Sequence, residues 1–332
     1  MKRYWLLVLC VVQFSCAGQR EMVNGVSFVG GPNEIDEQQT QSVVEVNANW
    51  VSLMPFGFVR NIHSPEVRFN ESRQWWGERK EGVTKTAKFF HDKGIKVMVK
   101  PQIWVWRGEF TGTIQMQSEE DWKSFEANYE TFILEYAWLA TEIDAEMLCI
   151  GTELNKFVSA RPEFWKKLIA KVRKVYAGKL TYAENWDTFA KVPFWDDLDY
   201  VGVDAYFPLS EKRTPTIDDL KKGWRSHKEQ IVEVYRKTKR PVLFTEYGYR
   251  STDYAGKEPW DSSYEESNVN LDAQKNGLQA LFEEFWSEDW FAGGFVWKWF
   301  DSHEKSGGTK DTRFTPQNKP AETLIKQHYQ SH

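Results

Sequence analysis

Residues 147–154 read Met-Leu-Cys-Ile-Gly-Thr-Glu-Leu, a short apolar run that ends in a glutamate. Residues 241–249, Pro-Val-Leu-Phe-Thr-Glu-Tyr-Gly-Tyr, repeat that arrangement. Six more short apolar or β-branched runs occur, and amphipathic helical stretches separate the runs, which indicates a parallel sheet with crossover helices. The eight runs cover residues 25–30, 50–58, 96–105, 147–154, 180–185, 200–207, 241–249 and 291–300.

The intervening segments carry helix signals. Apolar residues recur every three or four positions through residues 118–143. Pro162 suits the first turn of a helix over 163–176, and Thr216 with Asp219 forms a capping pattern before a helix over 220–237. Gly94 follows a helix that carries Phe89 and Phe90.

Eight such units in 332 residues match a (β/α)8 TIM barrel, so we predict an α/β fold of one domain. The gap between the fifth and sixth runs is short, which predicts that the fifth helix is reduced to a turn around Pro193 and Trp195. A doubly wound open sheet is the alternative. Gly30-Gly31-Pro32 does not extend into GxGxxG, so there is no phosphate loop to favour it.

Composition excludes several functional classes. The formal net charge is −5 and 27% of residues are charged, which fits neither a basic nucleic-acid binder nor a charge-driven disordered chain. Aromatic residues make up 16%, including 17 Trp, so part of this flat apolar surface is available to face a ligand.

The first residues resemble a secretory signal. Lys2 and Arg3 precede an apolar run over 5–12, which is too short to span a membrane, and small residues follow at 15–18. This segment resembles a bacterial lipoprotein processing site in which Cys16 becomes the lipidated first residue. Cleavage near Ala17 without a lipid is the alternative. We therefore expect a signal and anchor over 1–18, a catalytic body over 19–332, and an exported lipoprotein at the outer membrane, its periplasmic face or the cell surface.

The cysteines and histidines predict neither disulfides nor a metal. Cys149 alone remains in the body once Cys10 is removed with the signal and Cys16 serves as the anchor. The six histidines are scattered without the spacing of a zinc site. We expect no cofactor.

Two carboxylates stand where chemistry is expected. Barrel active sites form at the carboxyl ends of the strands, and Glu153 and Glu246 end the fourth and seventh runs. A glutamate at a buried strand end is costly unless it is paired or functional. A strand-end ion pair would explain one such glutamate, but two facing one barrel mouth match the carboxyl pair that glycoside hydrolysis requires.

Here the sequence resembles glycoside hydrolases of clan A, and most of all family 113, whose characterised members are retaining β-1,4-mannanases. The resemblance covers residues 25–329, and its motifs lie at 150–154, 203–209, 244–248 and 316–322. It implies that Glu153 is the acid/base and Glu246 the nucleophile, with carboxyl groups about 5 to 5.5 Å apart. Thr152 replaces the asparagine that many clan members place before the acid/base, so their contact with the sugar 2-hydroxyl cannot be assigned to this position.

The sixth run supplies supporting residues. In related enzymes a tyrosine at the position of Tyr206 donates to the nucleophile, although an ordinary rim tyrosine is the alternative. Asp204 points to the same side of the strand and could order Tyr206 or bind a hydroxyl. Arg60, just after the second run, could orient the nucleophile or lie on the surface.

Sugar binding needs aromatic platforms and polar side chains. Trp104, Trp106, Asn185, Trp186 and Trp297 lie at or beside run ends and are our candidate substrate-binding residues. Trp297 matches the platform that clan A enzymes commonly carry beneath the cleaved sugar. Each tryptophan could instead belong to the core. Gln102 stands where relatives are expected to have histidine.

The leading hypothesis is a secreted, monomeric, retaining hydrolase that cleaves β-1,4-linked mannan or mannooligosaccharides by double displacement. One alternative keeps the machinery for another β-1,4-glycan, such as glucan or xylan, or transfers the sugar onto a second sugar. Another is an inactive surface glycan-binding barrel, which would have no need of both glutamates.

Overall fold

The computed structural model describes residues 21–261 and 268–332, so the predicted signal over 1–18, with Cys16, lies outside the described residues. Eight parallel strands close a barrel in the order β1-β10-β9-β8-β7-β6-β4-β2. The barrel prediction is confirmed, and the open-sheet alternative is wrong. The barrel strands are β1 (Val23–Phe28), β2 (Trp50–Leu53), β4 (Lys96–Val99), β6 (Met147–Thr152), β7 (Lys179–Asn185), β8 (Val201–Asp204), β9 (Val242–Tyr247) and β10 (Phe291–Trp299).

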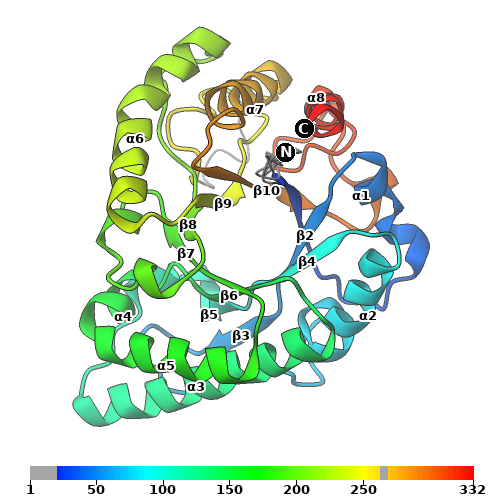
Figure 1. The fold of residues 1–332 in the computed structure, drawn as a ribbon. Helices are drawn as coiled ribbons and strands as arrows, with labels where there is room; N and C mark the ends of the chain where they lie inside the picture. Colours follow the sequence, from blue (N-terminus) through cyan, green and yellow to red (C-terminus); the bar gives the residue numbers. More distant parts are fainter. Residues whose placement is uncertain (1–20, 262–267) are drawn as a thin grey trace, which may run out of the picture.

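Helices surround this barrel (Figure 1). They are α1 (Gln41–Glu45), α2 (Lys80–His91), α3 (Glu119–Glu142), α4 (Asn155–Ala160), α5 (Pro162–Val175), α6 (Ile217–Thr238), α7 (Leu271–Phe285) and α8 (Pro320–Ser331). Between β7 and β8 the chain makes only two 3-10 turns, η5 (Phe189–Lys191) and η6 (Trp195–Asp197), as the short gap predicts. Further 3-10 turns are η1 (Glu37–Thr40), η2 (Trp76–Glu78), η3 (Trp106–Gly108), η4 (Thr111–Thr113) and η8 (His303–Lys305).

The predicted helix starts correspond to local capping. The Thr216 hydroxyl accepts the backbone N–H of Asp219 while the Asp219 carboxylate accepts that of Thr216, which satisfies two donors that the first turn of α6 would leave unpaired. Ser118 accepts the N–H of Asp121 at the start of α3. Pro162 occupies the first turn of α5, where a missing N–H costs nothing.

The second and third apolar runs are each broken by a proline, so the expectation of one strand per run is wrong there. Pro55 separates β2 from β3 (Phe56–Val59), and Pro101 separates β4 from β5 (Gln102–Val105). Proline lacks an N–H for the ladder and turns the chain out of the barrel wall. Strands β3 and β5 pair in parallel as a separate two-stranded sheet, which we call the rim sheet.

Alternation along the rim sheet gives it two different faces. Phe56 pairs with Gln102 and Phe58 with Trp104, so these four side chains share one face. Gly57 faces the other way, and a Cβ there would meet Phe132 of α3 at 3.0 Å. The rim sheet therefore packs one face on α3 and presents the other at the barrel mouth.

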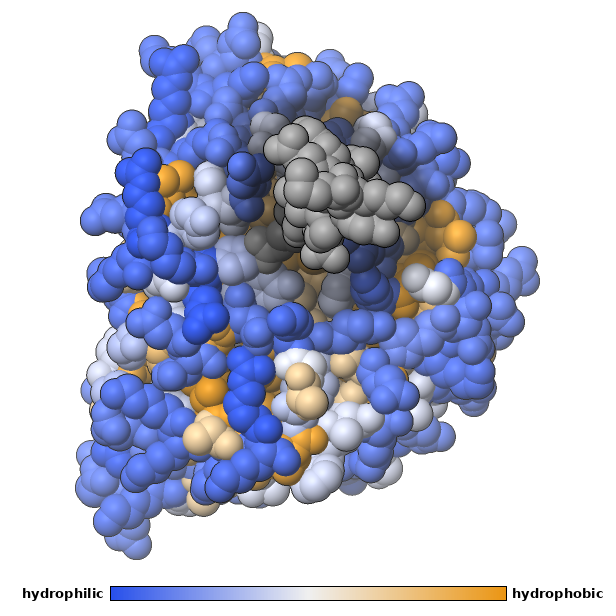
Figure 2. Space-filling model, viewed as in Figure 1, coloured by the Kyte–Doolittle hydropathy of each residue, from blue (hydrophilic) through white to orange (hydrophobic). Residues whose placement is uncertain are grey.

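The barrel interior is filled by side chains rather than hollow. A buried cluster of large and small apolar residues occupies it, formed by Val23, Trp50, Met98, Met147, Cys149, Ala183, Leu243, Ala292 and Phe295. Burial raises the pKa of the Cys149 thiol to about 11, so this cysteine is an inert core residue. Hydrophilic residues dominate the face shown in Figure 2, with hydrophobic residues scattered between them. Among the described helices, none is both long and apolar enough to cross a bilayer.

Candidate active site

A cleft of about 1060 Å³ opens at the carboxyl ends of the barrel strands. Its lining includes Glu153, Glu246 and Trp297, together with the aromatic face of the rim sheet. The volume is at the upper end of that of ordinary small-molecule sites. The two predicted carboxylates thus share one large cleft.

Glu246 ends β9 and is 6% exposed. Its Oε1 accepts hydrogen bonds from the Lys100 ammonium and, at 3.1 Å, from Gln102 Nε2. Its Oε2 accepts the Tyr206 hydroxyl at 2.8 Å. Three donors therefore converge on the two oxygens of Glu246 and fix the orientation of its carboxyl group in the cleft.

Lys100 lies at the centre of a buried charge cluster. Its side chain is fully buried, and Nζ lies 3.2 Å from Asp204 Oδ1 as well as against Glu246. Burial opposes its charge, but the carboxylates of Asp204 and Glu246 outweigh that effect and raise the pKa of Lys100 above its ordinary value. Lys100 is the cation that balances these two carboxylates.

Asp204 has no route to a substrate hydroxyl in this arrangement. It is completely buried, and Oδ1 accepts both Lys100 and, at 2.8 Å, the Thr245 hydroxyl. Burial, followed by the negative charge of Glu246, raises its pKa to about 7. Asp204 therefore belongs to the buried charge cluster around Lys100 and Glu246, and its predicted role as a hydroxyl ligand has no support in this geometry.

Glu153 follows β6 in a left-handed backbone conformation, with φ of 52°. Its N–H donates to Ala183 O at 2.8 Å, and its carbonyl accepts Thr111 Oγ1 at 3.3 Å, so both neighbours fix this unfavourable conformation. Burial, followed by the charges of Asp204 and Glu246, raises the pKa of Glu153 well above its ordinary value. The raised pKa favours the protonated form of Glu153, which is the form that can donate a proton.

Tyr206 is buried between Glu246 and Phe314. Its ring meets the ring of Phe314 edge to face, with centroids 5.8 Å apart. Burial and the nearby charge of Glu246 raise the pKa of Tyr206 well above its ordinary value, so the hydroxyl stays protonated and can donate.

The predicted substrate-binding residues fall into two groups. Trp104, Trp106 and Trp297 line the cleft, and about half of the Trp104 side chain is exposed. Asn185 and Trp186 are not among the described residues that line it. The Asn185 side chain instead accepts the N–H of Trp186, whose ring stacks on Trp260 with centroids 5.1 Å apart.

Several cleft residues escaped sequence reasoning. Lys100 directly follows β4 and stands inside the run predicted over 96–105, so the cost of burying a charge was an available signal. Glu78 lines the cleft, and burial raises its pKa to about 7. Arg60 also lines the cleft, but Lys100 and Gln102 make the contacts to Glu246 that were suggested for Arg60. Further aromatic lining residues are Phe56, Phe58, Trp75 and Phe110.

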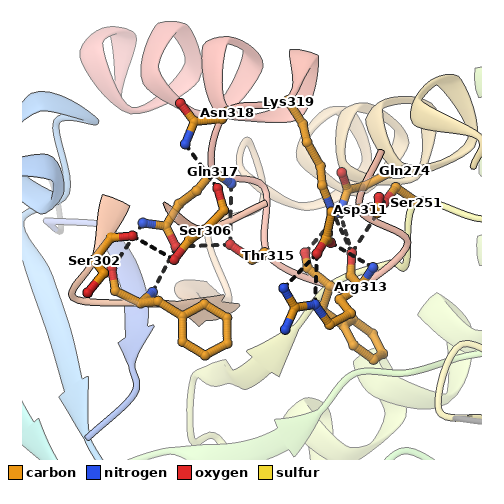
Figure 3. Close-up of polar contacts among 12 residues, drawn as sticks. Ser251, Gln274, Ser302, Ser306, Asp311, Arg313, Thr315, Gln317, Asn318 and Lys319 are labelled. Atoms are coloured by element: carbon orange, nitrogen blue, oxygen red, sulfur yellow. Dashed lines mark hydrogen bonds and ion pairs between the residues drawn. The ribbon is translucent and has the colours of Figure 1, made fainter. Parts of the chain in front are cut away.

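The motif at 316–322 organises the segment between β10 and α8. Figure 3 shows two groups of polar contacts at the start of α8, one around Gln317 and one around Lys319. Asn318 adds hydrogen bonds to the carbonyls of His303 and Ser306 at 2.7 and 2.9 Å. No hydrogen bond or ion pair joins the described residues 316–322 to Glu153 or Glu246. No cluster of His, Cys, Asp and Glu able to hold a metal occurs within residues 21–261 and 268–332.

Comparison with solved structures gives close matches over the whole barrel. The GH113 β-mannanase of Alicyclobacillus acidocaldarius, in complex with ManMIm, is 26% identical with a TM-score of 0.81, and the match covers 93% of this chain and 97% of that one. A GH113 β-1,4-mannanase is 25% identical with a TM-score of 0.80, covering 94% and 100% of the two chains.

More distant matches share only the fold. A β-glucuronidase from Ruminococcus gnavus is 14% identical with a TM-score of 0.59, covering 93% of this chain and half of that one. A search among curated proteins finds no match.

The sequence comparison assigns the family directly. The family model of Glycoside Hydrolase Family 113 matches residues 32–319, well over half of the chain. The match includes Glu153, Glu246 and every cleft-lining residue except Val29 and Gly30. The chain therefore belongs to glycoside hydrolase family 113 and is a glycoside hydrolase.

Proposed function

We propose that this glycoside hydrolase cleaves β-1,4-linked mannan or mannooligosaccharides with retention of configuration. The observation that carries the proposal is the pairing, in one cleft, of a glutamate whose two oxygens accept three donors with a glutamate whose pKa is well raised. Retaining hydrolysis needs one ionised and one protonated carboxyl group. The solved relatives named as β-mannanases support the choice of sugar.

In the first step Glu246 attacks the anomeric carbon and forms a glycosyl ester while the bond to the leaving oxygen breaks. Glu153 transfers its proton to that oxygen, so the leaving sugar departs as a neutral alcohol. In the second step Glu153, now a carboxylate, takes a proton from water. The resulting oxygen attacks the anomeric carbon, the ester breaks, and Glu246 returns as the anion.

The residues around Glu246 make this cycle possible at neutral pH. Lys100, Gln102 and Tyr206 stabilise the carboxylate that forms each time the ester breaks. Trp297, Trp104 and Trp106 offer aromatic surfaces for the C–H faces of successive sugars, which fits cleavage within a chain.

The test is release of reducing ends by residues 19–332 from linear β-1,4-mannan, run beside cellulose and xylan. We expect release from mannan, and NMR should show the β-anomer of the product first. Glu246→Ala should abolish release, whereas the surface variant Glu130→Gln should leave it unchanged. Release from cellulose or xylan instead of mannan would contradict the substrate, and glycan binding without any release would favour a binding protein.

We further propose that residues 1–18 export the protein, that Cys16 carries a lipid anchor, and that the body is a monomer. Support for export and for the lipid anchor comes from the basic, apolar and small-residue pattern of residues 1–18 alone. Labelled palmitate should enter the full chain but not Cys16→Ser. Light scattering of residues 19–332 should give the mass of one chain.

A further inference from the structure

Phe314 is the aromatic neighbour of the tyrosine that donates to the nucleophile. Its ring meets that of Tyr206 at an interplanar angle of 69°, and no other ring contact to Tyr206 is found among the described residues. The Arg250 guanidinium lies 5.5 Å from the centre of the same ring. Gln274 Nε2 donates to the Phe314 carbonyl at 2.8 Å, so both the ring and the backbone of this residue are held.

Lys319 holds the segment that precedes Phe314, through contacts with Asp311 and Arg313. The Lys319 side chain is fully buried, and its ammonium donates to Asp311 Oδ1, the Arg313 carbonyl and Ser251 Oγ at 2.8, 2.8 and 2.9 Å. All three ammonium hydrogens thus have partners. Figure 3 shows this group converging from three separate segments.

On the other side of Phe314 the chain is held by Gln317. Its amide bonds both backbone groups of Phe300, accepting the N–H at 2.8 Å and donating to the carbonyl at 3.0 Å. Thr315 donates to the same Gln317 oxygen at 3.0 Å. The backbone of Gln317 also lies very close to Gly307. A Cβ on residue 307 would lie 1.8 Å from the backbone carbonyl oxygen of Gln317, and the φ of 67° at Gly307 independently favours glycine.

We propose that Phe314, held in place by the Lys319 and Gln317 contacts, is a positioning residue that keeps the Tyr206 hydroxyl directed at Glu246. The proposal rests on the proposed function of Tyr206 and Glu246. Phe314 touches neither carboxylate and acts only through the phenol ring. A small displacement of a group that acts in catalysis is enough to reduce the catalytic rate substantially. Loss of the contact between the Phe314 and Tyr206 rings should therefore lower the rate measurably.

Phe314→Leu is the principal test, because leucine keeps apolar bulk but removes the ring edge. We expect kcat on mannan to fall about fivefold to tenfold with KM within about twofold, and the acid limb of the kcat/KM profile to move to higher pH. In a Tyr206→Phe background the same change should lower kcat by less than about twofold, because no phenol hydroxyl remains to be positioned. Phe314→Tyr, which keeps the ring, should retain most of the activity.

Equal losses in both backgrounds would overturn the proposal and leave Phe314 a packing residue. Asp311→Asn, which keeps the shape of the Lys319 contact but removes the charge, should lower kcat in the same direction, and Lys319→Met serves as the stronger version if it folds.

A substrate-free measurement separates this proposal from the proposed function. The Tyr206 hydroxyl proton, assigned by its loss in Tyr206→Phe, should broaden in the proton NMR spectrum of Phe314→Leu. An unchanged exchange broadening of this signal would refute the positioning role even if mannan is cleaved. Greater broadening, which loss of the Phe314 ring current alone would not cause, would support the role even if mannan is not the substrate.

Discussion

Replacing Lys100 by methionine removes the cation that balances Asp204 and Glu246. The N···O separation of 3.2 Å from Asp204 corresponds to about 5 kcal/mol at an effective dielectric constant of about 20. The cost of burying the ammonium offsets part of this gain. Removing one partner of a buried pair lowers the free energy of unfolding by about 3–5 kcal/mol. At about 2 °C per kcal/mol, the Tm of Lys100→Met should fall by about 6–10 °C at pH 7.5.

This loss should shrink in acid. Without Lys100, the carboxyl group of Asp204 gains more by holding a proton. A carboxyl group whose pKa is raised in the folded state stabilises the protein at low pH and loses that contribution as pH rises through the raised value. The deficit in Tm should therefore be smaller at pH 5 than at pH 7.5. Activity at pH 7.5 should fall about 10²-fold to 10³-fold, because the nucleophile loses a donor to Oε1.

Thermal unfolding at several pH values, with kcat measured on mannan, provides the assay. Lys228→Met is the matched control, because Lys228 is a half-buried lysine that pairs with Glu284 and Glu288 away from the cleft. Its free energy of unfolding should change by no more than about 1 kcal/mol, with the pH dependence of the parent. The reasoning is refuted if Lys100→Met keeps its Tm within 2 °C of the parent at pH 7.5, or if its deficit is the same at pH 5.

Three further predictions use the same cleft. Glu153→Gln should lower kcat on mannan about 10²-fold to 10⁴-fold and remove the alkaline limb of the pH profile, while an aryl mannoside with a good leaving group should be affected much less; equal losses on both substrates would argue against the acid role. The pKa of Asp204 is raised to about 7, so unfolding free energy should fall as pH rises from 5 to 8, and urea titrations of Asp204→Asn should show a weaker fall. Trp297→Ala should raise KM about tenfold with the Tm little changed, and an unchanged KM would remove Trp297 from the substrate contacts.

The parts of the site that sequence could predict are those carried by local patterns. Glu153 and Glu246 each end an apolar run, so the position and the unusual chemistry were visible in one short segment. Lys100 stood inside a predicted run rather than at its end. Its partners lie 104 and 146 residues away, and no local pattern identifies them.

The second and third runs, which proline breaks, could also be predicted only in part. Pro55 and Pro101 stood inside the predicted runs, and proline is a strand breaker. What could not be predicted is that the two detached pieces pair with each other. Asn185 and Trp186 were predicted to bind substrate because they end a strand, but they are not among the described residues that line the cleft. A side chain at a strand end can turn towards a neighbouring loop, as that of Trp186 does when it stacks on Trp260.

Because β3 pairs with β5 outside the barrel, the cleft is built from two separate hydrogen-bonded units, the barrel and the rim sheet. The closed barrel carries the reactive charges, whereas the rim sheet carries much of the aromatic surface along the cleft, and Gln102 is the rim-sheet residue that bonds Glu246. Substitutions at Phe56, Phe58 or Trp104 can therefore accumulate without disturbing the ladder that holds the nucleophile. Such a scaffold lets glycan preference diverge among descendants while the bond-breaking chemistry is inherited intact.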